Sequence, residues 1–182
     1  MGRVDIHPAT LLGRHTAPKA AFAGAAILIG VGTWLIVAHH PRPAGVAVVL
    51  AALLLLSGSV MADTHGSRTL SFLDSGLDRA FDGCLLTAIA FAFRHSDKWA
   101  AAAAISAVAL TFLAAYIRAR GRALGYRLPD ANLGRVLRYA VISIGLLGAW
   151  LFEAMLAVIG LTVVSGALEA RQVMRQVAAS RR

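Results

Sequence analysis

The stretch 72-FLDSGLDRAFDG-83 places three aspartates, Asp74, Asp78 and Asp82, four residues apart. In an α-helix each step of four residues turns a side chain by only about 40°, so the three carboxylates share one helix face. The apolar run 84–93 follows directly. Charged groups beside such a run are costly unless something compensates them.

Two interpretations of this acidic face stay open from spacing alone. A divalent cation bound by the carboxylates is the simplest compensation. The alternative is that Arg79 and neighbouring basic residues neutralise the acids and have only a structural role.

Composition defines the class of protein. The chain has 182 residues, of which 58% are hydrophobic and 15% charged, with a mean hydropathy of +0.70. Soluble domains contain about 25% charged residues, so we expect an all-α, polytopic membrane protein. A net charge of +9 would suit nucleic acid, but the basic residues lie between apolar runs, and no nucleic-acid partner is expected.

Apolar runs predict one membrane domain, 1–182, with six transmembrane helices. The expected spans are about 19–38, 44–62, 70–93, 99–117, 134–149 and 151–168. The last two form one apolar stretch, which we divide near Trp150. Residues 1–18 are expected to form a cytoplasmic segment or a short helix in the membrane interface, and 169–182 a cytoplasmic tail. Ser96 or Asp97 is expected to cap the fourth helix.

The basic residues also predict the orientation. With six spans, all Lys and Arg residues except Arg42, Arg94 and Lys98 fall on the side of the termini. Positive charge accumulates on the cytoplasmic side of membrane proteins. We therefore expect both termini in the cytoplasm and the chain in the cytoplasmic (plasma) membrane.

Two groups of residues resemble a known family. The segment 73–82, Leu-Asp-Ser, Leu-Asp-Arg and a further Asp, resembles the second half of the CDP-alcohol phosphotransferase motif. That motif reads D-x-x-D-G-x-x-A-R, eight residues, then G-x-x-x-D-x-x-x-D. The segments 116–120 and 134–138 resemble the tyrosine-basic-Ala-Arg and paired-arginine segments of the phosphatidylinositol phosphate synthase branch. The resemblance covers most of residues 44–140.

The resemblance implies a reaction and a set of site residues. The family transfers a phosphatidyl group from a CDP-linked lipid to an alcohol, here one similar to inositol phosphate, and releases CMP during phospholipid synthesis. By resemblance, Asp74, Asp78 and Asp82 would bind Mg²⁺ or Mn²⁺, and Asp78 would also be the catalytic base.

The same resemblance assigns three arginines to the substrate. Arg118, Arg135 and Arg138 would line a pocket for an anionic acceptor, because guanidinium groups bind phosphate well. The alternative for each is simple anchoring at the lipid headgroups.

The first half of the motif is degenerate. Without a gap, Leu53 and Leu56 stand where the family has its two leading aspartates; with one deletion, Leu54 and Ser57 stand there. The motif arginine is also absent. A leucine offers no lone pair to a metal and a serine hydroxyl is a weak neutral ligand, so the family's two-metal cage is incomplete.

Asp63 and Arg68 keep the five-residue spacing of the missing Asp–Arg pair. They are candidates for recruitment to the site, although their closeness to Asp74 in sequence favours a loop.

Three functional hypotheses follow. The first is an active transferase with an altered site. The second, which the lost carboxylates favour, is a catalytically silent relative that binds lipid, nucleotide or an active homologue. The third is a small transporter or channel with the acidic face as a cation path. Expected partners are membrane lipid, a CDP-linked lipid, and a second copy of the chain or an active homologue.

Overall fold

The computed structural model describes residues 8–65, 68–126, 128 and 132–180; within these ranges the side chains of 8–15, 63, 65, 68, 71, 132–133 and 179–180 are not described. Its described residues form six helices and no strand, which confirms the all-α prediction. The helices are α1 (Pro8–Val37), α2 (Pro41–His65), α3 (Arg68–Phe93), α4 (Lys98–Ala123), α5 (Asn132–Gly148) and α6 (Leu151–Ser180).

Local sequence accounts for the helix ends. Asp97, one of the two expected caps, accepts a hydrogen bond from the backbone N–H of Ala100 at 2.9 Å and starts α4. His39 and Ala149 both have φ of 60° and turn the chain after α1 and α5. Gly125, with φ of 84°, does the same after α4, a conformation that glycine adopts without steric cost. The turn at Ala149 separates α5 from α6 next to Trp150.

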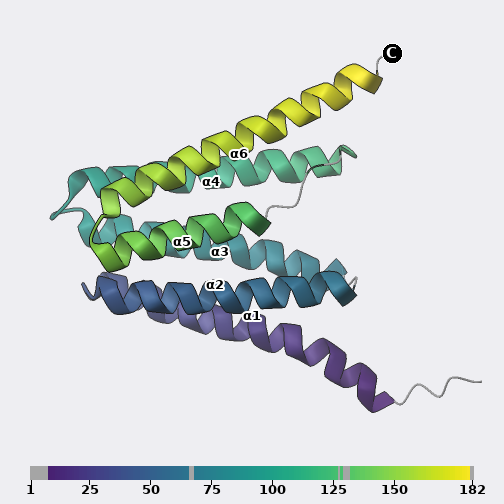
Figure 1. Cartoon of the computed structure of the whole chain (residues 1–182), viewed down its shortest axis with the longest axis horizontal. Coiled ribbons are helices and arrows are strands. Elements are labelled where there is room, and N and C mark those ends of the chain that lie inside the picture. Colours follow the sequence, from purple (N-terminus) through teal and green to yellow (C-terminus); the bar gives the residue numbers. More distant parts are fainter. Residues whose placement is uncertain (1–7, 66–67, 127, 129–131, 181–182) are drawn as a thin grey trace, which may run out of the picture.

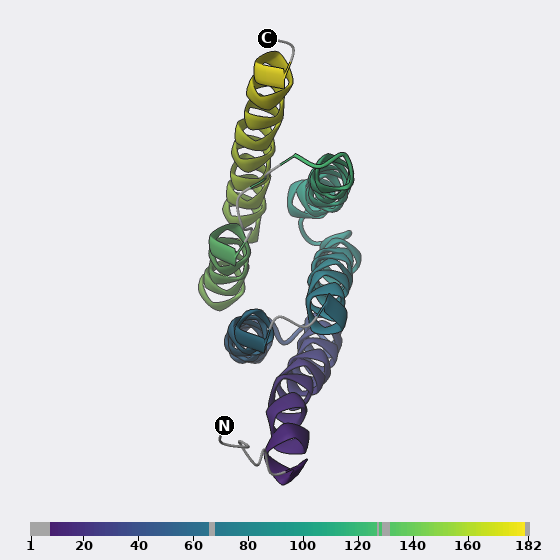
Figure 2. The same cartoon turned by 90° about the vertical axis from the view of Figure 1, so that its right-hand side faces the viewer.

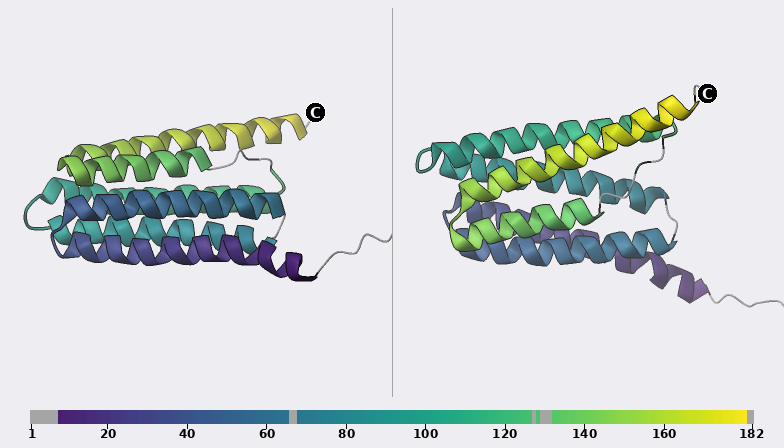
Figure 3. Two further views of the ribbon diagram at one scale, coloured as in Figure 1. Left: turned by 60° about the horizontal axis from the view of Figure 1, so that its bottom comes forward. Right: turned by 45° about the horizontal axis from the view of Figure 1, so that its top comes forward.

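The helices lie alongside one another in two rows of three. The α1–α2, α3–α4 and α5–α6 turns gather at one end of the molecule, and α6 finishes at the other (Figures 1 and 3). Seen from the end, α6, α5 and α2 form one row, and α4, α3 and α1 form the other (Figure 2). Within each row neighbouring helices pack closely, and α1 with α2 and α4 with α6 close the two sides.

The middle of the bundle is different. Among the described residues, α3 and α5 are not a closely packed helix pair. Ion pairs between long side chains nevertheless join these two helices, as detailed below. The two rows are therefore bridged at their centres by polar side chains.

In the described parts of the chain, four helical segments are long and apolar enough to cross a membrane: Thr16–Val37, Pro41–Ala62, Lys98–Ala123 and Leu151–Ala178. Large apolar side chains such as Trp34 and Trp99 are exposed on the outer surface, as expected for helices that face lipid. By the same criteria α3 and α5 are not among these segments. α3 carries the acidic face, and α5 has 17 residues, or about 26 Å of helix. The chain is thus an integral membrane protein by its apolar helices, and six spans remain a prediction.

The expected N-terminal segment is not a separate helix where it is described. α1 begins at Pro8 and continues through Pro18 to Val37. Its N-terminal part extends away from the bundle (Figure 1). Residues 1–7 lie outside the described residues, so an interfacial position for this segment stays a prediction.

Candidate functional site

The acidic face of α3 turns into the bundle. The side chains of Asp78 and Asp82 are 2% and 1% exposed, and that of Asp74 is 15% exposed. Arginines from α5 approach all three carboxylates, so the predicted common face exists. These acids lie between α3 and α5, at the centre of the two helix rows.

Arg135 of α5 joins the first two carboxylates. Its Nη1 lies 2.8 Å from Oδ1 of Asp74, and its Nη2 lies 3.1 Å from Oδ2. Its Nε lies 2.9 Å from Oδ1 of Asp78. The pair with Asp74 is bidentate, which is the geometry that the planar guanidinium group favours with a carboxylate.

Arg138, three residues further along α5, joins the second and third carboxylates. Its Nη2 lies 3.0 Å from Oδ2 of Asp82 and 3.6 Å from Oδ2 of Asp78. Among the described residues neither Asp82 oxygen has a partner in hydrogen-bond geometry, so this contact is an ion pair without a directed bond. Both side chains are almost completely buried, where Coulomb attraction is screened least.

Asp78 is the most connected of the three acids. Besides Arg135 and Arg138, it binds Arg79 of α3, whose Nη1 lies 2.9 Å from Oδ2. The hydroxyl of Tyr139 donates to Oδ1 of Asp78 at 3.5 Å, a long hydrogen bond. Three carboxylates therefore face three guanidinium groups. These six side chains, which we call the cluster, have balanced formal charges.

Ser59 of α2 also belongs to this cluster, and sequence reasoning missed it. Its buried hydroxyl accepts a hydrogen bond from Nη1 of Arg135 at 2.8 Å and lies within hydrogen-bonding distance of Asp74. A serine inside the apolar run of α2 was the available signal. Its contribution depends on the packing of three helices, which no local pattern shows.

Arg118 has a different ion-pair partner from the other two predicted substrate arginines. On α4 it forms a buried ion pair with Glu169 of α6, with Nε 3.0 Å from Oε1. Sequence reasoning did not single out Glu169. The structure therefore places Arg135 and Arg138 together at the acidic face, while Arg118 binds across a different helix pair.

The side chains of Asp63 and Arg68 lie outside the described residues. Within the described part of the chain, no group of three or more His, Cys, Asp or Glu side chains is arranged to hold a metal ion. The three aspartates of α3 are directed toward arginines instead.

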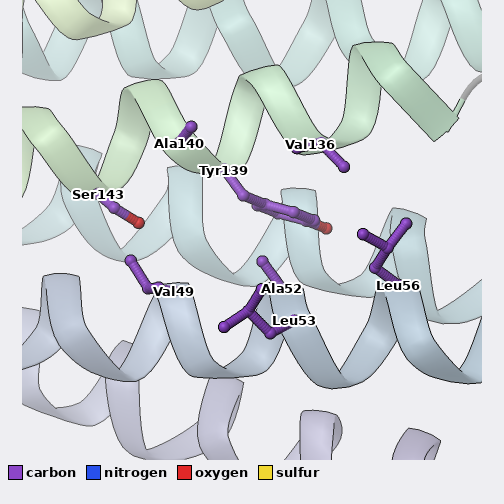
Figure 4. A pocket seen from close by; sticks show the side chains of 8 residues that line it. All are labelled: Val49, Ala52, Leu53, Leu56, Val136, Tyr139, Ala140 and Ser143. Atoms are coloured by element: carbon purple, nitrogen blue, oxygen red, sulfur yellow. The ribbon is translucent and has the colours of Figure 1, made fainter.

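An apolar pocket of about 140 Å³ lies between α2 and α5, next to the cluster. Figure 4 shows the Tyr139 ring across this pocket, with Leu53 and Leu56 on the α2 side. These two leucines stand at the leading aspartate positions in the ungapped reading of the motif. The pocket wall at these positions is therefore hydrocarbon.

The bundle and its buried acidic face define the chain as an integral membrane protein with the fold of the CDP-alcohol phosphotransferases. It is similar to the crystal structure of phosphatidylinositol phosphate synthase from Mycobacterium tuberculosis with CDP-DAG bound, with a TM-score of 0.67 and 17% sequence identity. The similarity covers 91% of this chain and 90% of that one. Neither protein-family models nor curated proteins give a match to the sequence. At this identity the similarity concerns the fold, and there the expected resemblance is confirmed.

Proposed function

We propose that this chain is a membrane protein of the CDP-alcohol phosphotransferase type that binds a CDP-linked lipid but does not carry out the family's metal-dependent transfer. In this proposal the bundle crosses the cytoplasmic membrane six times with both termini in the cytoplasm. The lipid part of the ligand rests against the bundle, and its anionic head lies at the cytoplasmic ends of α3 and α5. The proposal of this ligand is supported by the fold, because the similar synthase structure contains bound CDP-DAG.

The observation that carries the proposal is the chemistry of the leading motif positions. In the ungapped reading Leu53 and Leu56 line the apolar pocket. In the reading with one deletion, Leu54 is partly buried and packs against the hydrophobic core. The Ser57 hydroxyl donates a hydrogen bond to the backbone carbonyl of Leu54 at 2.8 Å. Neither reading supplies a carboxylate, so half of the family's donor set is missing.

The residues present do not fit the metal site that the family implies. Mg²⁺ and Mn²⁺ prefer several oxygen ligands, mostly carboxylates and water. Here the remaining carboxylates are bound by Arg79, Arg135 and Arg138. We therefore derive no catalytic step through a metal.

A second candidate function is an active transferase with an altered site. It is favoured by Asp78, which remains buried beside the Tyr139 hydroxyl and would be the base that activates an acceptor hydroxyl. In this case one Mg²⁺ or Mn²⁺ would be held by Asp74, Asp78 and Asp82, or by a donor set that recruits Asp63. The fold similarity favours both candidates over a transporter or channel.

Release of CMP separates the two candidates. Purified protein in liposomes would receive CDP-diacylglycerol, Mg²⁺ or Mn²⁺, and inositol phosphate or glycerol phosphate as acceptor. We expect thermal stabilisation by CDP-diacylglycerol and no release of CMP. Metal-dependent release that disappears in Asp78→Asn would establish the transferase instead. Absence of any stabilisation would contradict ligand binding, and the next experiment would be a search for a co-purifying active homologue.

A further inference from the structure

The two α5 arginines match the acidic face of α3 in spacing. The aspartates recur every four residues along α3, and Arg135 and Arg138 are three residues apart on α5. Arg135 contacts both Asp74 and Asp78, and Arg138 contacts both Asp78 and Asp82. One guanidinium group thus lies between each successive pair of carboxylates, where a bridging cation would otherwise be placed.

We infer that Arg135 and Arg138 replace divalent cations in this fold: they are the permanent counter-ions of the α3 aspartates, and the folded chain binds no divalent metal there. The inference deepens the proposed function and rests on it, since it concerns the same site. It explains how the three carboxylates stay buried without a metal.

The inference is supported by the fact that a guanidinium group and a metal ion would compete for the same carboxylate lone pairs. The Nη1 and Nη2 groups of Arg135 donate to the two oxygens of Asp74, so these oxygens already accept strong charge-assisted hydrogen bonds. A metal at the same oxygens would have to break these hydrogen bonds. The Arg135 side chain is 7% exposed, so its guanidinium group would then be buried beside a second positive charge.

The charge of the cluster leads to the same conclusion. Arg79, Arg135 and Arg138 balance the three carboxylates, so little net negative charge remains to attract a divalent ion. Asp82 is the acid with the fewest contacts, since within the described part of the chain its ion-pair partner is Arg138 alone. Removal of Arg138 is therefore the change that should most readily expose carboxylate oxygens to a metal.

Direct binding of Mn²⁺ tests the inference without any activity assay. The full chain in detergent micelles would be titrated with Mn²⁺ and followed by electron paramagnetic resonance, and its melting temperature would be compared in EDTA and in Mg²⁺. For the wild type we expect no bound Mn²⁺ and the same melting temperature in both solutions. For Arg135→Gln/Arg138→Gln we expect Mn²⁺ affinity to rise about tenfold or more. Arg120→Gln, a matched charge removal at an exposed α4 arginine, should behave like the wild type.

Two results would overturn the inference: wild-type Mn²⁺ binding that EDTA reverses and Asp78→Asn abolishes, or a folded double variant that gains no affinity. If the double variant does not fold, the wild type and Asp78→Asn decide alone. Metal binding without CMP release would reject this inference and leave the proposed function standing. No stabilisation by CDP-diacylglycerol, in a wild type that also binds no Mn²⁺, would reject the proposed function and leave this inference standing.

Discussion

Arg135 and Asp74 are 61 residues apart in the sequence, yet they form a bidentate ion pair across the centre of the bundle, at 2.8 and 3.1 Å. The pair joins α5 to α3, two helices that do not pack closely in the described residues. Side-chain charge thus holds together a region where backbone packing does not.

Replacing Arg135 with methionine should strongly destabilise the fold. The substitution keeps most of the side-chain volume but leaves Asp74 without its bidentate partner. Breaking a buried ion pair from one side costs about 3–5 kcal/mol. Unfolding of the purified protein in mixed micelles would measure the loss. Arg120→Met, at an exposed position on α4, should change stability by less than about 0.5 kcal/mol. Equal effects of the two variants would contradict the importance of the pair.

Arg118 and Glu169 should behave as one energetic unit between α4 and α6. Either Arg118→Met or Glu169→Met alone leaves a buried charge without its partner. The double variant removes both charges, so it should be less destabilised than the sum of the single variants, with a coupling of about 0.5–3 kcal/mol. A double-mutant cycle measured by unfolding in micelles checks this. Strict additivity would show that the two side chains do not interact.

The helices and the acidic face were predictable because both depend on local sequence. Apolar runs and polar breaks specify the helices, and the four-residue spacing places Asp74, Asp78 and Asp82 on one face. The cap at Asp97 is equally local. Such features need no knowledge of which helices are neighbours.

Arg79, on the same helix, was named from the sequence as a partner of the acids, but their partners on other helices were not predictable in the same way. Arg135 and Arg138 were identified as site residues, but by resemblance, as ligands of an anionic acceptor. Which charge an arginine meets depends on which helices the bundle places opposite each other, and sequence spacing within one helix carries no information on that. The same reason explains why Ser59 and Glu169 were missed, since each has its partner on another helix.

Gly145 should be essential to the contact of α5 with α6. A Cβ at this position would lie 2.4 Å from the Cβ of Ala154, closer than real Cβ atoms approach. Gly145→Ala should therefore destabilise the protein by about 1–3 kcal/mol. Gly160→Ala in α6 is the matched control, because nothing lies within 4 Å of its Cβ. That control should stabilise the helix by about 0.5–1 kcal/mol. Similar melting temperatures for the two variants would show that α5 and α6 can separate without cost.

Labelling of single cysteines should show whether α3 and α5 cross the membrane. With Cys84→Ser as background, His39→Cys and Ser96→Cys lie at the end where the α1–α2 and α3–α4 turns gather. Leu124→Cys is an exposed position directly after the far end of α4. Six spans with cytoplasmic termini place 39 and 96 outside the cell. An impermeant maleimide should then label both in intact cells, and should label 124 only after permeabilisation. If only the four most apolar helices crossed, α3 would not cross, so 96 would lie in the cytoplasm and 124 outside the cell. Positions 39 and 124 would then be labelled in intact cells and 96 only after permeabilisation, which distinguishes four spans from six.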